Sequence, residues 1–396
     1  MSGKQPSGQS LDVPAVPDNP FLLPAMMAAA AVPAIIASFG QSFGQLARLV
    51  PDSDEESIAD HAPVWATPHD RRLDLDTMEL RDFSVGDTGV PTLICAPFAL
   101  HHATVADFSP GHSVVETLRN GGVGRLFVTD WRSASDDMRF LTIDSYLADL
   151  NVAVDDLEPP VDLIGLCQGG WMAIAYAARF PHKVRRLVLV GAPIDIAAGS
   201  SAISRAAVQI PLAAFEEFVR AHGGRVLGQH VLHLWGPALS AKDERQVLQL
   251  PASDHSATAN DLLRHFRNWY DATVDLPGTY YLQTVSWLFK ENRLAQGRFI
   301  ALGRRIELST IRHPLFMLAA RDDELVDADQ LFATARHVGT PKRQIETATE
   351  PCGHLGLFLG AETLQRSWTR IARWLGDDLA NALSPGEAAA VHGCST

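Results

Sequence analysis

Short apolar runs recur along this chain at intervals filled by helix-like segments, and this alternation constrains the fold more than any other feature. The runs are almost continuously apolar and cover residues 92–96, 126–129, 162–166, 187–190 and 315–319. Runs of this kind are typical of strands that helices cover on both faces. Strands that alternate with helices form a mostly parallel sheet, so the sequence predicts an α/β fold from about residue 71 onward.

The alternation stops between about residues 197 and 300, and this stretch is too long to be a loop. Its aromatic residues are Phe215, Phe218, Trp235, Phe266, Trp269, Tyr270, Tyr280, Tyr281, Trp287 and Phe289. We expect a helical cap that is inserted over the sheet. The predicted organisation is therefore a disordered start with an apolar helix and a linker (1–60), a first core part (61–196), the cap (197–300), a second core part (301–382) and a flexible tail (383–396).

The region before the core carries its own apolar stripe. Ile36, Phe39, Phe43, Leu46 and Val50 recur at spacings of 3, 4, 3 and 4, which predicts an amphipathic helix. One interpretation is a helix packed on its own domain, and the other is a docking surface for a partner or a hydrophobic particle. Two prolines interrupt the uncharged stretch 21–39, and the leader carries acidic residues, so we expect neither a transmembrane span nor a secretory signal.

Composition argues against several classes of protein. The 33 basic and 46 acidic side chains give a net charge of −13, whereas nucleic-acid binding needs a basic face. The cysteines are too few and too scattered for a disulfide framework, so the cytoplasm is the expected compartment. His230 and His233 have no carboxylate or cysteine nearby to complete a metal site, so we expect no metal.

The strongest motif is Gly165-Leu166-Cys167-Gln168-Gly169-Gly170, which begins at the end of the apolar run 162–166. It matches the nucleophile-elbow pattern, in which a strained turn between a strand and a helix exposes the nucleophile. The N-terminal end of the following helix favours the thiolate of Cys167. The backbone N–H of Gln168 is placed to donate to a developing oxyanion. The alternative is a buried structural cysteine between two glycines that let strand and helix approach.

A cysteine nucleophile needs a base, and the base needs an orienting acid. In the order of α/β-hydrolases, the acid and then the histidine follow the nucleophile, each just after a late strand. Asp323 follows the run 315–319, and His354 follows an expected strand at 344–347. Cys167, Asp323 and His354 are therefore the predicted catalytic triad, and Asp322 is the alternative acid.

The second oxyanion donor usually lies after an early central strand. Here the run 92–96 is followed by Phe98, whose backbone N–H is the predicted donor, and by Ala99, the alternative donor. His101 and His102 lie in the same loop, where we expect them to shape the mouth of the site.

These residues resemble the polyhydroxyalkanoate synthase family, and most closely its short class III catalytic subunits, over about residues 90–375. Besides the elbow, the matching segments are Thr129-Asp130-Trp131, Leu141-Thr142-Ile143-Asp144-Ser145-Tyr146, Glu291-Asn292-Arg293-Leu294, Leu302-Gly303-Arg304-Arg305-Ile306-Glu307-Leu308 and Gly353-His354-Leu355-Gly356. The resemblance implies an α/β-hydrolase fold in which Cys167 carries the acyl group and His354 is its base. It also implies that Asp323 acts on the incoming hydroxyl.

The implied reaction moves a 3-hydroxyacyl group from coenzyme A to the cysteine and then to the hydroxyl of a growing polyester. Coenzyme A thioester is then a substrate, and no bound cofactor is expected. The alternatives are a polyester depolymerase, ester hydrolase or thioesterase with the same triad, and a granule-associated scaffold. The expected partners are 3-hydroxyacyl-coenzyme A or a polyester chain, and a polymer granule, an accessory subunit and a homo-oligomer stay open.

The chain departs from the family at the acid loop. Family members carry Asp-His-x-Val-Pro, whereas this chain has Asp323-Glu324-Leu325-Val326-Asp327, so the His and the Pro are both replaced. The elbow also lacks the Cys-Gln-Pro type of turn found in related intracellular polyester depolymerases. The resemblance therefore supports the superfamily more firmly than the reaction.

A basic patch lies near the end of the expected cap. It consists of Lys290, Arg293, Arg298, Arg304 and Arg305, with a single acidic residue among them. One interpretation is that the patch holds the phosphates of coenzyme A by charge. The simpler interpretation is a solvated face beside the cap.

Overall fold

The structure is a computed structural model that describes residues 63–235 and 239–382. The expected disordered start, the apolar stripe at 36–50 and the tail at 383–396 lie outside the described residues.

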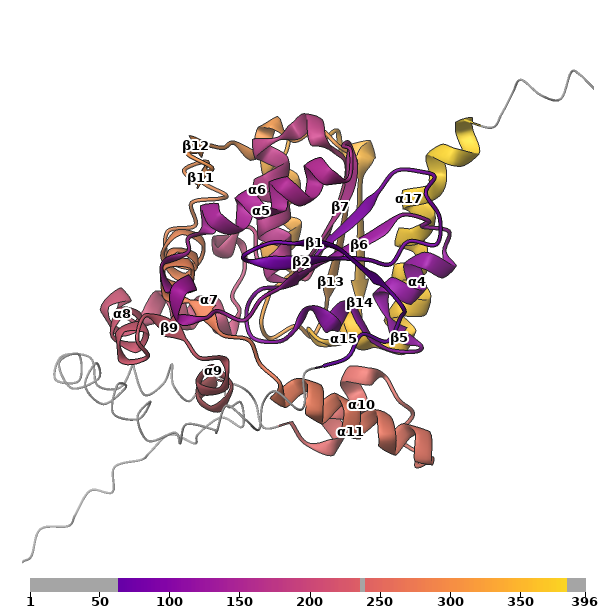
Figure 1. Ribbon diagram of the computed structural model, residues 1–396, viewed down its shortest axis with the longest axis horizontal. Coiled ribbons are helices and arrows are strands. Elements are labelled where there is room, and N and C mark those ends of the chain that lie inside the picture. The colour runs from indigo at the N-terminus through magenta and orange to yellow at the C-terminus, as the bar shows by residue number, and fades with distance from the viewer. Residues whose placement is uncertain (1–62, 236–238, 383–396) are drawn as a thin grey trace, which may run out of the picture.

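An eight-stranded sheet forms the centre of the molecule, in the order β1-β2-β6-β3-β7-β8-β13-β14 (Figure 1). Its strands are β1 (Asp70–Asp74), β2 (Met78–Asp82), β3 (Thr92–Cys95), β6 (Leu126–Trp131), β7 (Val161–Leu166), β8 (Val184–Val190), β13 (Leu315–Ala320) and β14 (Ile345–Glu350). The six strands from β6 to β14 run parallel, and β2 and β1 add antiparallel strands at one edge. The expectation of a mostly parallel sheet is confirmed.

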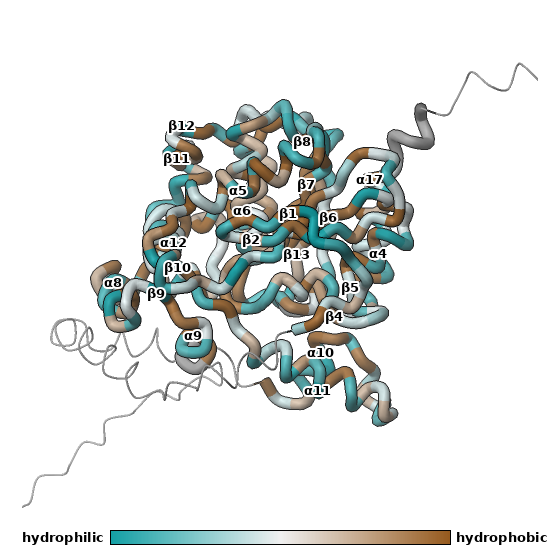
Figure 2. Tube along the Cα trace, in the orientation of Figure 1, coloured by the Kyte–Doolittle hydropathy of each residue, from teal (hydrophilic) through white to brown (hydrophobic). Residues whose placement is uncertain are grey.

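Helices cover both faces of this sheet, as the continuous apolar runs predicted. The α5 helix (Ile143–Asp156) and the α6 helix (Gln168–Arg179) lie on one side, and α4 (Val114–Asn120) and α17 (Thr369–Ala382) lie on the other (Figure 1). Every residue of β7 and β13 is buried between these layers. Figure 2 shows the hydrophobic residues concentrated along the central strands.

The α5 helix shows how the local sequence specifies these elements. Thr142 and Ser145 form a capping box that satisfies backbone N–H groups at the start of the helix. Ile143, Tyr146 and Leu150 then recur at helical spacing and are buried against the sheet. The segment 141–146 that resembles the synthase family therefore holds a helix start and its core-facing side chains.

The described residues between β8 and β13 are mainly helical. Their helices are α7 (Ala202–Gln209), α8 (Leu212–Ala221), α9 (Gly228–Trp235), α10 (Ala241–Leu248), α11 (Ala257–Asp271), α12 (Gly278–Gln283) and the π-helix η6 (Thr284–Lys290). Three two-stranded sheets complete the fold: β4 (Asp107–Ser109) with β5 (His112–Ser113), β9 (Arg225–Val226) with β10 (Leu276–Pro277), and β11 (Ile300–Ala301) with β12 (Arg304–Arg305).

These helices gather at the end of the sheet where the parallel strands terminate. The α10 helix packs against α15 (Gly356–Leu359), which follows β14. Ligands of open α/β sheets bind at the carboxyl ends of the strands, so the helical segment lies over the expected position of the site. Among the described residues, no helix is both long and apolar enough to cross a membrane.

Candidate active site

Cys167 lies on the turn between β7 and α6, in a backbone conformation that side chains rarely adopt. Its φ is 48° and its ψ is −116°, which is strained for a residue with a Cβ. The surrounding hydrogen bonds hold the turn: the Cys167 N–H donates to the Val190 carbonyl at 2.8 Å, and the Gly170 N–H donates to the Cys167 carbonyl at 2.9 Å. This geometry is that of the nucleophile elbow predicted from the sequence.

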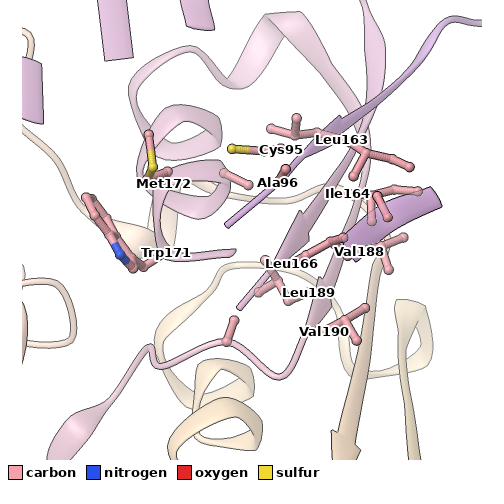
Figure 3. Close-up of a cluster of buried hydrophobic side chains, with 14 of the residues drawn as sticks. Cys95, Ala96, Leu163, Ile164, Leu166, Trp171, Met172, Val188, Leu189 and Val190 are labelled. Carbon is pink, nitrogen blue, oxygen red and sulfur yellow. The ribbon is translucent and has the colours of Figure 1, made fainter. Parts of the chain in front are cut away.

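The glycines of the motif are required by close packing around the turn. A Cβ on Gly165 would lie 2.5 Å from the Cα of Gly170, and a Cβ on Gly169 would lie 2.6 Å from the Ala96 carbonyl oxygen. Figure 3 shows Ala96 and its neighbour Cys95 at the end of β3, beside the start of α6. The small residues therefore allow β3, β7 and α6 to meet beneath the nucleophile.

His354 links the other two members of the predicted triad. Its Nδ1 lies 2.7 Å from Oδ2 of Asp323, and Cys167 is near enough to act on the charge of its ring. The His354 side chain is 7% exposed and that of Asp323 only 1%. The three residues come from three strand ends that are far apart in the sequence, and the fold brings them together.

The electrostatics of His354 favour its protonated form. Burial by itself lowers the pKa of the imidazole, but the Asp323 carboxylate and Cys167 oppose this effect and raise the pKa well above its usual value. A cysteine and a histidine in this arrangement stabilise each other as a thiolate and an imidazolium. For the other two described cysteines, burial raises the pKa of Cys95 and raises that of Cys352 to about 11, so both are thiols near pH 7.

The structure distinguishes the two candidate acids. The side chain of Asp322 is 55% exposed, and its nearest basic group is Arg321, at 3.7 Å. In contrast, Oδ1 of Asp323 accepts hydrogen bonds from the backbone N–H groups of Leu325 and Val326, both at 2.9 Å. Oδ2 of Asp323 is therefore available to orient His354. Asp323, and not Asp322, is the acid that contacts the histidine.

The two predicted oxyanion donors flank the elbow. Gln168 is the first residue of α6, so its N–H has no partner within the helix. Phe98 lies just past β3, where its buried ring contacts the rings of Tyr146 and Tyr280, with centroids 4.7 and 5.2 Å away. The role of both backbone N–H groups stays a prediction.

Tyr280, from α12, is an aromatic residue of the predicted cap that interacts electrostatically with the nucleophile. It is buried, its hydroxyl donates to the Met172 sulfur at 3.6 Å, and Cys167 contributes to its electrostatic environment. Its ring also lies near Trp171, with centroids 6.3 Å apart. The sequence identified the segment as aromatic, but no local pattern separates Tyr280 from the other rings.

Of the two histidines after β3, His101 packs against the helical segment, and the expectation that the pair shapes the mouth of the site stays a prediction. The ring of His101 packs against Trp269 and Tyr270 of α11, with centroids 4.7 and 4.9 Å away. The His101 backbone also pairs with Thr273. Burial lowers the pKa of His101 to about 4, so the ring is neutral near pH 7. His101 thus fixes the loop that carries Phe98 to the helical segment.

The basic patch is partly engaged within the protein. Lys290 donates to the backbone carbonyls of Ala207 and Ile210, and Arg293 forms a two-pronged ion pair with Glu291. Arg304 and Arg305 are exposed on the β12 strand. Fewer basic side chains of the patch are therefore available to bind a ligand than the sequence implied.

His230, which lies three residues from His233 in the sequence, is paired with a different histidine in the structure. Nδ1 of His230 lies 2.7 Å from Nε2 of His222, whose own Nδ1 lies 2.8 Å from the Phe218 carbonyl oxygen. The side chain of His233 is outside the described residues. Within the described part of the chain, no group of three or more His, Cys, Asp or Glu residues is placed to hold a metal ion.

Comparisons with curated proteins find relatives over most of the chain. The poly(3-hydroxyalkanoate) polymerase subunit PhaC of Synechocystis sp. is 27% identical over 338 residues, which cover 80% of this chain and 86% of that protein. The subunit of the same name from Allochromatium vinosum is 23% identical over 300 residues, with coverages of 73% and 83%. The 2-hydroxy-6-oxo-2,4-heptadienoate hydrolase of Pseudomonas putida is 51% identical over 190 residues, covering 46% of this chain and 54% of that protein.

A solved structure and a family model also match this chain. Among solved structures, the monoacylglycerol lipase of Paleococcus ferrophilus has a TM-score of 0.49 and 14% identity, covering 76% of this chain and 98% of that one. A family model described as "alpha/beta hydrolase fold" matches residues 122–361, more than half of the chain. The chain therefore belongs to the alpha/beta hydrolase fold family, and the resemblance to polyhydroxyalkanoate synthases is confirmed by polymerase subunits related to most of its length.

Proposed function

We propose that this protein is an acyltransferase that polymerises 3-hydroxyacyl units through a thioester on Cys167. The observation that carries the proposal is the Cys167–His354–Asp323 arrangement, in a chain related to polyhydroxyalkanoate polymerase subunits. The position of Cys167 on the elbow leaves its sulfur at the carboxyl end of the sheet, where a substrate can reach it. The names of the polymerase relatives point to a polyester of 3-hydroxyalkanoate units, and the family resemblance implies that coenzyme A carries the acyl group.

In the first half-reaction, the Cys167 thiolate attacks the carbonyl carbon of the acyl-coenzyme A thioester. The bond between that carbon and the coenzyme A sulfur breaks, and the leaving sulfur takes a proton from His354. The N–H of Gln168 stabilises the negative charge on the carbonyl oxygen during this step. The product is a thioester between the acyl group and Cys167.

In the second half-reaction, a hydroxyl group at the end of a polyester chain attacks the thioester. His354 takes the hydroxyl proton, the new ester bond forms, and the Cys167 thiolate is released. Both oxygens of Asp323 are already engaged, one by two backbone N–H groups and the other by His354. This arrangement favours a role in which Asp323 orients the imidazole, in place of direct contact with the incoming hydroxyl.

Transfer to a hydroxyl requires that water be kept from the thioester. Tyr280 from the helical segment, Phe98 from the oxyanion loop and Tyr146 from α5 form a buried aromatic cluster beside the elbow. Such a cluster lowers the local water content and favours the organic acceptor over hydrolysis. We therefore assign the helical segment, residues 197–300, as a cap that shields the acyl-enzyme.

The second candidate is a hydrolase that uses the same intermediate, in which water replaces the chain end. The observation that favours it is the partial relative from Pseudomonas putida, whose name is that of a hydrolase. That relative is matched over about half of its length, whereas the polymerase subunits are matched over most of theirs. Polymerisation is thus the better-supported proposal.

The two candidates differ in their products from 3-hydroxybutyryl-coenzyme A. A polymerase releases coenzyme A together with turbid polymer and little free acid, and it is then expected to attach to polymer granules. Stoichiometric free 3-hydroxybutyrate without polymer would assign the protein to the hydrolases. Release of soluble acids from added amorphous polyester, with no coenzyme A release from several acyl chain lengths, would identify a depolymerase. The variant Cys167→Ala is the control, because it should release no coenzyme A in any case.

A further inference from the structure

The loop that carries the triad acid also contacts the beginning of the helical cap. The backbone N–H of Ala202 donates to the Glu324 carbonyl at 3.1 Å, and the N–H of Ser200 donates to Oδ2 of Asp327 at 3.0 Å. We call residues 199–202 the cap neck and residues 323–327 the acid loop. The two segments are more than 120 residues apart in the sequence, so the contact is a product of the fold.

The cap neck fits closely against the carboxylate of Asp327. A Cβ on Gly199 would lie 2.5 Å from the Cγ of Asp327 and 2.8 Å from each of its carboxylate oxygens. Real Cβ atoms do not approach other heavy atoms this closely, so with a larger residue at position 199 either the Asp327 carboxylate or the neck would have to move, and the contact would change. The contact therefore needs both a glycine in the neck and a carboxylate in the loop.

The same loop positions the triad. Leu325 and Val326 donate their backbone N–H groups to Oδ1 of Asp323, and Oδ2 of Asp323 binds His354. Asp327 directly follows Val326, so a shift of Asp327 moves one of the two backbone donors that hold Asp323. One end of a five-residue loop thus binds the cap neck, and the other end orients the base of the nucleophile.

This contact depends on a residue in which the chain departs from the family it resembles. The family motif has proline where this chain has Asp327, and a proline side chain accepts no hydrogen bond. Asp327 also caps the short α13 helix (Ala328–Phe332), because its Oδ1 accepts from the N–H of Asp329 at 2.9 Å. One carboxylate therefore joins the cap neck, the acid loop and the start of α13.

We propose that Asp327 is a positioning residue that couples the placement of the cap to the orientation of Asp323, and through Asp323 to the His354–Cys167 pair. The proposal rests on the triad assigned under the proposed function. It predicts that loosening the cap neck weakens the Asp323–His354 bond, which makes the imidazolium and the thiolate less stable. The reactivity of Cys167 would then report the contact, whichever substrate the enzyme uses.

The cap has a second attachment nearby, which should keep it folded when Asp327 is changed. The Nδ2 group of Asn292 donates to Oδ1 of Asp195 at 2.8 Å, and the other carboxylate oxygen of Asp195 lies 2.8 Å from Nε2 of His337. The N–H of Ile196 donates to Oδ1 of Asn292 at 3.1 Å. The two ends of the cap are thus joined to each other and to α14 (Thr334–His337) without the help of Asp327.

The test measures the rate at which iodoacetamide alkylates Cys167 as a function of pH. Asp327→Ser keeps a side-chain oxygen that can cap α13 but removes the second oxygen that binds Ser200. We expect the pH of half-maximal alkylation to rise by about half a unit to one unit, because the thiolate loses part of its stabilisation. Asp329→Ser is the matched control, since it removes the same charge two residues away without touching the neck, and it should leave the midpoint unchanged.

Gly199→Ala disturbs the same contact from the cap side without changing any residue of the acid loop. Like Asp327→Ser, it should raise the pH of half-maximal alkylation. It therefore tests the proposal on its own if Asp327→Ser does not fold. The proposal would be overturned if both variants had the same pH of half-maximal alkylation as the wild type. If Asp327→Ser does not fold, an unchanged midpoint in Gly199→Ala alone would overturn it. Asp323→Asn is the reference: if it does not raise the midpoint either, the triad assignment fails and not only the coupling.

Discussion

Replacement of Gly169 by alanine tests the reason for the glycine in the elbow. Gly169 is the second residue of α6, and its backbone faces the end of β3. An added Cβ would lie 2.6 Å from the Ala96 carbonyl oxygen and 2.8 Å from the Cys95 carbonyl carbon, and closer still to the Cys95 oxygen. These atoms belong to the backbone of a buried central strand, so they cannot rotate away as a side chain would.

Two opposing effects set the size of the change in stability. Alanine stabilises a helix by about 1 kcal/mol relative to glycine. Overpacking a rigid core costs about 1–3 kcal/mol, and a clash with backbone should lie at the upper end of that range. The net destabilisation is therefore about 2 kcal/mol, which lowers the thermal midpoint by about 4 °C or more.

Gly376 offers a matched control for the same substitution. It lies inside α17, where a Cβ would meet no other heavy atom within 4 Å. Gly376→Ala should keep the helical gain without the clash and raise the thermal midpoint by about 2 °C. The difference between the two variants, about 3 kcal/mol, isolates the steric effect at the elbow.

Thermal unfolding of the two variants and the wild type, followed by circular dichroism, measures these shifts. Activity should separate the variants as well, because displacing β3 or α6 moves both the Cys167 sulfur and the nearby oxyanion loop. A displacement of about 1 Å can lower turnover about 100-fold. If Gly169→Ala were as stable and as active as Gly376→Ala, the packing argument for the elbow would be wrong.

Three further outcomes are expected. Asp323→Asn should lower turnover by about 100-fold or more, whereas Asp322→Asn should stay within about twofold of the wild type, as steady-state kinetics of the two variants would show. Brief iodoacetamide treatment near pH 7 should label Cys167 ahead of Cys352, whose raised pKa keeps it a thiol, and peptide mapping by mass spectrometry would reveal the reverse order. The unfolded state protonates His101 below pH 6.5, whereas the folded state resists protonation until about pH 4, so the wild type loses stability as the pH falls through this range. His101→Phe has no proton to bind at this position. Between pH 7 and 4.5, denaturant titrations should therefore show a loss of stability about 1–2 kcal/mol smaller in His101→Phe than in the wild type.

The sequence predicted the elements whose signals are local. The elbow could be identified because strand, nucleophile, glycines and helix are consecutive, and each constrains the backbone at Cys167. The two late strands could also be placed from the sequence, because β13 and β14 are each followed by a candidate catalytic residue, the acid and the base. The choice between Asp322 and Asp323 could not be made this way, since a shift of one residue at a strand end exchanges an exposed side chain for a buried one.

Contacts between distant segments had no local signal. The sequence placed His101 in a loop near the site, but it did not show that the ring packs against α11 residues about 170 positions later. The same holds for Asp327, which the sequence marked only as a departure from a family motif and which the fold places against Gly199. Such pairs depend on how the helical segment folds back over the sheet, and no periodicity within either segment encodes that geometry.

The most direct test of the account is whether an acyl group accumulates on Cys167. The protein would be mixed with 3-hydroxybutyryl-coenzyme A for a few seconds, quenched in acid and digested, and the peptide that contains Cys167 would be weighed by mass spectrometry. The account predicts a mass increase of one 3-hydroxybutyryl unit or of several in series, which is absent in Cys167→Ala and reduced in His354→Ala. Coenzyme A release in the wild type without any acyl group on Cys167, or with the group on another residue, would contradict it.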